Sequence, residues 1–226
     1  MKRVITVLLA VLLVLSLAAC GSGVETKKLA GTWTCTIDVT DRMNAAAEQA
    51  LGLSAADGAA KMPLQLVLTV TEDGAYTLRY DSDAARTALD AYAAALHPAA
   101  VESVYAAAEE QGLSREEYDA AMEKAGITMD DMVAAIFAGV DEEELLSLLT
   151  GRSAALTGYC RAEGGQLYLA DTAAELAETA DCLSYTLSDG TMTWTDAQGE
   201  LSSQLTEQEQ ELLRVPLTWT KQEESK

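Results

Sequence analysis

The stretch GTWTCTIDVT, residues 31–40, alternates between apolar and polar side chains. Successive side chains of a β-strand point to opposite faces, so Trp33, Cys35 and Ile37 would share one face and the threonines the other. Threonine suits the outer face of a strand, because its β-branched side chain fits the pleat and its hydroxyl is hydrated. The stretch therefore predicts a strand with Trp33, Cys35 and Ile37 turned toward an interior.

The same pattern recurs at the other end of the chain. Each of the three tryptophans stands between two threonines, at 32–34, 193–195 and 218–220. Trp194, Leu217 and Trp219 are therefore predicted to face an interior as well. Glycine-containing turns at 72–74, 163–165 and 188–190 separate further strand-like runs into hairpins. About eight antiparallel strands in sequential order predict an up-and-down barrel or a strongly curved sheet.

Residues 83–151 interrupt this β-pattern with apolar side chains at helical spacing. A capping box begins at Ser114, another helix start lies at Thr128, and acidic residues at 141–144 suit the start of a further helix. We predict four or five short helices in this insertion, and one more from Met43 to Leu53. The fold class is then α+β, with a β-domain at 29–82 and 152–222. The insertion either caps the mouth of a barrel, presents a surface to a partner, or only stabilises the fold.

The first 20 residues, MKRVITVLLAVLLVLSLAAC, have the pattern of a secretory signal. Their last four, Leu17-Ala18-Ala19-Cys20, resemble the lipobox of bacterial lipoproteins. The resemblance implies a signal peptide at 1–19, lipidation of Cys20 with palmitate-type chains, and a lipidated tether at 20–28. The protein would be held on the extracytoplasmic face of a cell membrane by its lipid anchor. A Gram-positive membrane and an outer membrane both fit this pattern.

Gly31 and Trp33 match the Gly-x-Trp motif that opens the first strand of lipocalins. The chain also resembles lipocalin-like (calycin-type) bacterial lipoproteins of an uncharacterised family, with Asp73-Gly74-Ala75-Tyr76 as a "DGxY" hairpin. This resemblance implies that Trp33 plugs the closed end of the barrel and that the open end holds an apolar ligand. The insertion at 83–151 departs from the lipocalin pattern.

The formal net charge of −21 argues against nucleic acid as a partner. His97, the single histidine, is interpreted as a residue near a helix end, which leaves no His cluster for zinc and no His base for a nucleophile. We predict no metal, no cofactor and no catalytic residues, with an uncharacterised hydrolase as the minority interpretation. Cys35 is expected to be a buried thiol. Cys160 and Cys182 are the candidates for a disulfide, although hairpin order would place another strand between theirs.

Two functions follow from these patterns. The first is a membrane-anchored lipoprotein that binds a small apolar or amphipathic ligand. The alternative is a protein-interaction or structural module of the cell envelope with no small-molecule ligand. An empty apolar cavity favours the first, and a filled interior with an exposed apolar patch on the helices favours the second.

Overall fold

The computed structural model describes residues 25–53, 61–138, 155–178, 182–198 and 213–223. The chain divides into two compact units. Of the described residues, the barrel unit comprises 25–35, 66–80, 155–178, 182–198 and 213–223, and the helical unit comprises 36–53, 61–65 and 81–138. Residues 36–65, which the sequence pattern assigned to the β-domain, thus fall in the helical unit, because the division passes through the first two strands.

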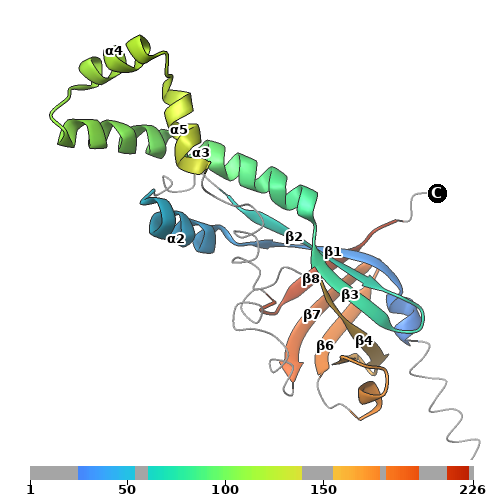
Figure 1. Ribbon diagram of the computed structural model, residues 1–226. Helices are drawn as coiled ribbons and strands as arrows, with labels where there is room; N and C mark the ends of the chain where they lie inside the picture. The colour runs from blue at the N-terminus through green and yellow to red at the C-terminus, as the bar shows by residue number, and fades with distance from the viewer. Residues whose placement is uncertain (1–24, 54–60, 139–154, 179–181, 199–212, 224–226) are drawn as a thin grey trace, which may run out of the picture. The chain divides into compact units, whose positions relative to one another are not determined.

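Eight antiparallel strands in the described residues close into a barrel in chain order (Figure 1). They are β1 (Gly31–Asp38), β2 (Pro63–Val70), β3 (Ala75–Tyr80), β4 (Leu156–Glu163), β5 (Gln166–Ala170), β6 (Cys182–Ser188), β7 (Thr191–Gln198) and β8 (Leu217–Lys221). The barrel closes where β1 pairs with β8, with Trp33 opposite Lys221 and Thr34 opposite Thr220. The prediction of an antiparallel up-and-down barrel is confirmed, and the barrel is closed rather than an open curved sheet.

The tryptophans of β1, β7 and β8 are part of the core. Trp33, Trp194 and Trp219 are 1%, 5% and 0% exposed. The indole Nε1 of Trp33 donates a 2.7 Å hydrogen bond to the carbonyl oxygen of Leu29. Cys35 and Leu217 are buried with them, but Ile37 is only half-buried. The prediction that Ile37 faces the interior is therefore corrected. This residue follows Cys35, in the part of β1 that belongs to the helical unit.

Close backbone approaches explain two glycines of the barrel. Gly74 ends the turn between β2 and β3 with φ +87°, and a Cβ there would lie 2.4 Å from the carbonyl oxygen of Cys160. The Cys160 amide donates to the Gly74 carbonyl oxygen at 2.7 Å, so the turn is tied to β4. At Gly158, a Cβ would meet the Ala170 carbonyl oxygen at 2.6 Å. Glycine is required where two backbones come this close.

The last four residues of the predicted tether, 25–28, belong to a helical turn before β1. Residues 25–29 form one helical turn, and Thr26 is buried. The Thr26 hydroxyl accepts from the Ala162 amide at 3.0 Å, and the Glu25 carboxylate accepts from the Gly164 amide at 2.8 Å. Residues 25 and 26 are thus fixed to β4 and to the turn after it. These bonds join residues far apart in the chain, which is why a local pattern does not reveal them.

The helical unit contains α2 (Thr40–Leu51), α3 (Ser82–Glu110), α4 (Arg115–Ala125) and α5 (Met129–Phe137). A correction concerns α3, which runs without a break through Pro98 where short helices were expected. Proline removes one helical hydrogen bond, but Leu96, Ala100 and Val104 continue the buried stripe across it, so packing sustains the helix. The helix expected from residue 141 lies outside the described residues.

Polar contacts join the helices of this unit. The Arg115 guanidinium contacts both oxygens of Glu102 at 2.7 and 3.1 Å and lies 4.6 Å from the centre of the Tyr105 ring. These contacts join the start of α4 to the end of α3. His97 lies inside α3, not near a helix end as predicted, and its Nε2 is 3.1 Å from Asp130 Oδ1 of α5.

The three cysteines of the barrel strands, Cys35, Cys160 and Cys182, are free and buried. The candidate disulfide between Cys160 and Cys182 is therefore not formed. β5 pairs with both β4 and β6, so a whole strand separates the two thiols.

Candidate ligand pocket in the helical unit

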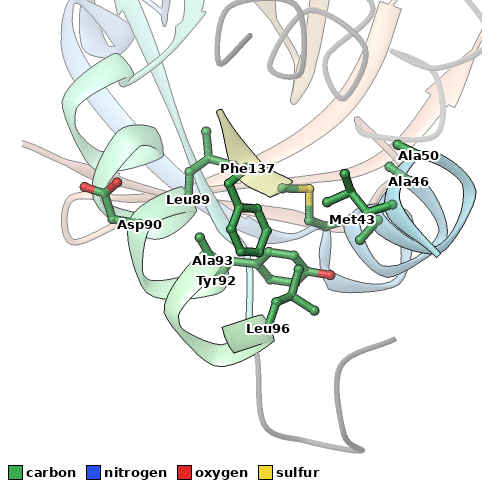
Figure 2. A pocket seen from close by; sticks show the side chains of 11 residues that line it. Met43, Ala46, Ala50, Leu89, Asp90, Tyr92, Ala93, Leu96 and Phe137 are labelled. Atoms are coloured by element: carbon green, nitrogen blue, oxygen red, sulfur yellow. The ribbon is translucent and has the colours of Figure 1, made fainter. Parts of the chain in front are cut away.

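An apolar pocket of about 240 Å3 opens between α2, α3 and α5 (Figure 2). Side chains from all three helices border it, and Phe137 is the contribution of α5. The lining residues are Met43, Ala46, Ala47, Ala50, Leu51, Leu89, Asp90, Tyr92, Ala93, Leu96 and Phe137.

The lining side of α2 follows from its sequence. Met43, Ala46, Ala47, Ala50 and Leu51 repeat at the three- and four-residue spacing that places side chains on one helix face. The Thr40 hydroxyl accepts from the Met62 amide at 2.8 Å, and this bond fixes the start of the helix. Gly52 ends it in the left-handed conformation with φ 65°.

The lining side of α3 has the same spacing. Leu89, Tyr92, Ala93 and Leu96 lie on consecutive turns, and Leu89, Tyr92 and Leu96 are buried. The Asp81 carboxylate starts this helix by accepting from the amides of residues 83 and 84. Residues 128 and 131 form a capping box that starts α5, the helix that ends at Phe137. Both starts are encoded locally, so the sequence places the lining side chains on their helices.

Small side chains leave the space open. Ala46, Ala47, Ala50 and Ala93 offer only a methyl group each, where leucine would add three more carbon atoms. Two bulky rings, Tyr92 and Phe137, border the same space (Figure 2). Small residues on two facing helices together with larger ones around them produce a pocket instead of a filled interface.

Few polar groups face the pocket. The Tyr92 hydroxyl donates to Oδ1 of Asn44 at 2.7 Å, which joins α3 to α2. Burial raises the pKa of Tyr92, so this hydroxyl stays protonated and remains a donor. Asp90 carries the one charged side chain of the lining, and it is exposed. Figure 2 shows its carboxylate directed away from the Phe137 and Tyr92 rings, so the charge lies at the rim.

The residues predicted as a site do not line this pocket. Gly31, Trp33 and Cys35 are on β1 of the barrel unit, and Trp194, Leu217 and Trp219 are on β7 and β8. Gly31 has φ +127°, and Lys221 Nζ lies 5.3 Å from the centre of the Trp33 ring. Cys20 lies outside the described residues. The pocket was missed, although alanines at helical spacing beside Met43 and Leu51 were visible in the sequence.

The barrel interior holds bulky side chains and little polar chemistry. The Nε1 atoms of Trp194 and Trp219 are buried, and within the described residues neither has a hydrogen-bond partner. The Cys160 thiol is inert at neutral pH, because burial raises its pKa to about 12. Within the described ranges, no three His, Cys, Asp or Glu side chains converge on a position that would suit a metal ion.

No protein-family model, no curated protein and no solved structure matches this chain. In the part of the chain that the structure describes, no helix combines the length and the apolar character needed to cross a bilayer. Among the described residues, the apolar pocket is the feature that most narrows the functions open to this protein.

Proposed function

We propose that this protein is an extracytoplasmic lipoprotein, anchored through Cys20, that binds the apolar part of a small molecule in the pocket of its helical unit. Lipocalin-like proteins hold their ligands in the barrel, and here the role passes to the helical unit, in which α2 and the insertion both line the pocket.

The pocket carries the ligand-binding part of the proposal. Its lining is methyl, thioether and aromatic groups, with Asp90 at the rim. Ligand sites typically combine an apolar interior with a few polar groups that orient the ligand. Burial of apolar ligand surface would contribute about 25 cal/mol for each Å2 removed from water.

The size of the pocket limits what enters it. A cavity of about 150 Å3 is known to accept benzene, and this pocket measures about 240 Å3. A substituted ring or a short alkyl segment therefore fits, whereas a whole lipid does not. A larger amphipathic ligand would place one end in the pocket and leave the rest outside.

Toluene is a direct probe of the pocket, because it is neutral and of the right size. The mature chain, residues 20–226 with Cys20→Ser, is purified without detergent and with labelled methionine methyls, titrated with toluene and followed by NMR. We expect saturable shifts of the Met43 methyl. Absence of any saturable shift would contradict the ligand-binding proposal.

Matched leucine substitutions test the location. Ala46 is a half-buried lining residue, so Ala46→Leu should fill the space and weaken toluene binding at least about tenfold. Ala106→Leu introduces the same side chain at an exposed position of α3 outside the lining and should leave binding unchanged. Equal binding by both variants would place toluene elsewhere.

A second candidate is a protein-interaction module of the cell envelope. The pocket volume is below the roughly 300 Å3 at which drug-sized sites begin, and it suits one leucine or phenylalanine side chain of a partner. Crosslinking in intact cells from a photoreactive residue at position 50 separates the two candidates. A protein adduct that Ala46→Leu abolishes would favour the interaction module, and a small-molecule adduct would favour ligand binding.

The anchoring part of the proposal depends on the LAAC sequence, residues 17–20. Palmitate fed to cells should label the wild-type chain, and Cys20→Ser should abolish the label. Cys35→Ser is the control, since that thiol is buried in the barrel. Labelling that persists in Cys20→Ser would refute lipidation at this position.

A further inference from the structure

The charges around the pocket distinguish between classes of amphipathic ligand. Asp90 is the charged side chain among the lining residues, and no lysine or arginine is among them. The other polar side chain of the lining, Tyr92, donates its hydroxyl hydrogen to Asn44 at 2.7 Å. A ligand headgroup at the rim therefore meets a carboxylate first.

The helices that form the pocket are acidic as a whole. The described parts of α2, α5 and the first five turns of α3 carry more carboxylates than guanidinium groups. The acids are Asp41, Glu48, Asp83, Asp90, Asp130 and Asp131, the guanidinium groups are those of Arg42 and Arg86, and the imidazole of His97 lies beside Asp130. Arg86 precedes Asp90 by one helical turn and offsets part of its charge. The net charge of these described helical segments remains negative.

We propose that the pocket selects amphiphiles with a cationic headgroup, such as alkylammonium ions, and discriminates against carboxylates such as fatty acids. This inference depends on the function proposed above. The apolar tail occupies the space between α2 and α3, and the ammonium group lies at the rim near Asp90. A carboxylate headgroup at the same place meets like charge and lacks a lining cation to pair with.

Three probes with one tail test the selection. Hexylammonium, 1-hexanol and hexanoate differ only in the headgroup, and each is titrated into the mature chain, residues 20–226 with Cys20→Ser, at pH 7 and low salt. We expect hexylammonium to bind at least about tenfold more tightly than hexanoate, with 1-hexanol between them. The preference should shrink at high ionic strength, because Asp90 is exposed and its field is screened.

Asp90→Asn tests whether the Asp90 carboxylate causes the preference for a cationic headgroup. It should bring the affinity for hexylammonium down to that for 1-hexanol. Glu123→Gln removes one charge from an exposed position of α4 and should change nothing. Because Asp90 is exposed, the variant should fold, and the headgroup comparison in the unsubstituted protein is independent of it.

The outcomes separate the two proposals. If toluene binds and hexanoate binds as tightly as hexylammonium, the charge selection is wrong and the pocket remains a ligand site. If Asp90→Asn keeps the full preference for hexylammonium, the assignment to Asp90 is wrong. If neither toluene nor any hexyl probe binds, the proposed function itself fails.

Discussion

The indole rings of Trp194 and Trp219 pack against each other in the barrel, with ring centres 4.8 Å apart and planes inclined at 48°. The register explains the contact. Trp194 lies opposite Leu217, and Met192 lies opposite Trp219, so the two tryptophans are diagonal neighbours on paired strands. Diagonal neighbours on one face are within reach of aromatic side chains. Strand pairing thus converts two Thr-Trp-Thr motifs into one aromatic contact.

Substitutions by phenylalanine should distinguish the tryptophans. Trp33→Phe removes the donor to the Leu29 carbonyl, and leaving a buried acceptor unpaired costs about 1–3 kcal/mol in addition to lost packing. Trp219→Phe removes an Nε1 that lacks a partner among the described residues, so it loses packing alone. Chemical denaturation should show the larger loss for Trp33→Phe. Equal losses would mean that the Leu29 hydrogen bond contributes nothing.

Gly158→Ala should destabilise the barrel through contact alone. Its Cβ would lie 2.6 Å from the Ala170 carbonyl oxygen and 2.9 Å from the Tyr76 ring, and such overpacking typically costs about 1–3 kcal/mol. Gly164→Ala is the comparison, because its Cβ would meet nothing within 4 Å and only its φ of +60° opposes the substitution. A thermal melt of Gly158→Ala that matches the unsubstituted protein would contradict the close packing of β4 against β5.

The Cys160 thiol should make stability depend on alkaline pH. Burial raises its pKa from the ordinary value of 9.0 to about 12 in the folded protein. Unfolding thus favours the thiolate. The contribution of the Cys160 thiol to the free energy of unfolding is fully present below about pH 9 and is lost as the pH rises toward 12. Urea unfolding between pH 8 and 10.5 should show a steeper decline for the unsubstituted protein than for Cys160→Ala. Parallel declines would indicate an accessible thiol.

The capping box of α4 should slow the hydrogen exchange of the backbone amides in that helix. The Ser114 hydroxyl accepts from the Glu117 amide and the Glu117 carboxylate accepts from the Ser114 amide, so Ser114→Ala should speed amide exchange in α4 roughly fivefold. Ser103→Ala, at an exposed position within α3, is the control.

The same capping box also predicts a pH dependence. The hydrogen bonds from the backbone and then the side chain of Ser114 lower the pKa of Glu117. The contribution of the Glu117 carboxylate to the stability of α4 is therefore present above pH 4.5, its ordinary pKa. It is lost as the pH falls through the lower pKa of this group in the folded protein. Exchange in α4 that stays constant from pH 6 to pH 3.5, after correction for intrinsic rates, would contradict this role.

Local patterns predicted the strands closely. The turns predicted at 72–74, 163–165 and 188–190 separate β2 from β3, β4 from β5 and β6 from β7, because period-two alternation and glycine turns depend on neighbours in the chain. The same holds for the capping boxes at Ser114 and Thr128. Pro98 shows where local reasoning fails: a proline signals a helix end, but a buried stripe on both of its sides kept α3 continuous.

The sequence by itself determined the antiparallel hairpin order, the inward tryptophans and the helical character of the insertion, since each depends on residues close together in the chain. Tertiary structure decided the closure of β1 onto β8, the docking of Thr26 at Ala162 and the pocket between α2 and α3. These features join segments that are far apart along the chain. Which segments meet depends on the packing of whole side-chain faces, and no local spacing of residues encodes it.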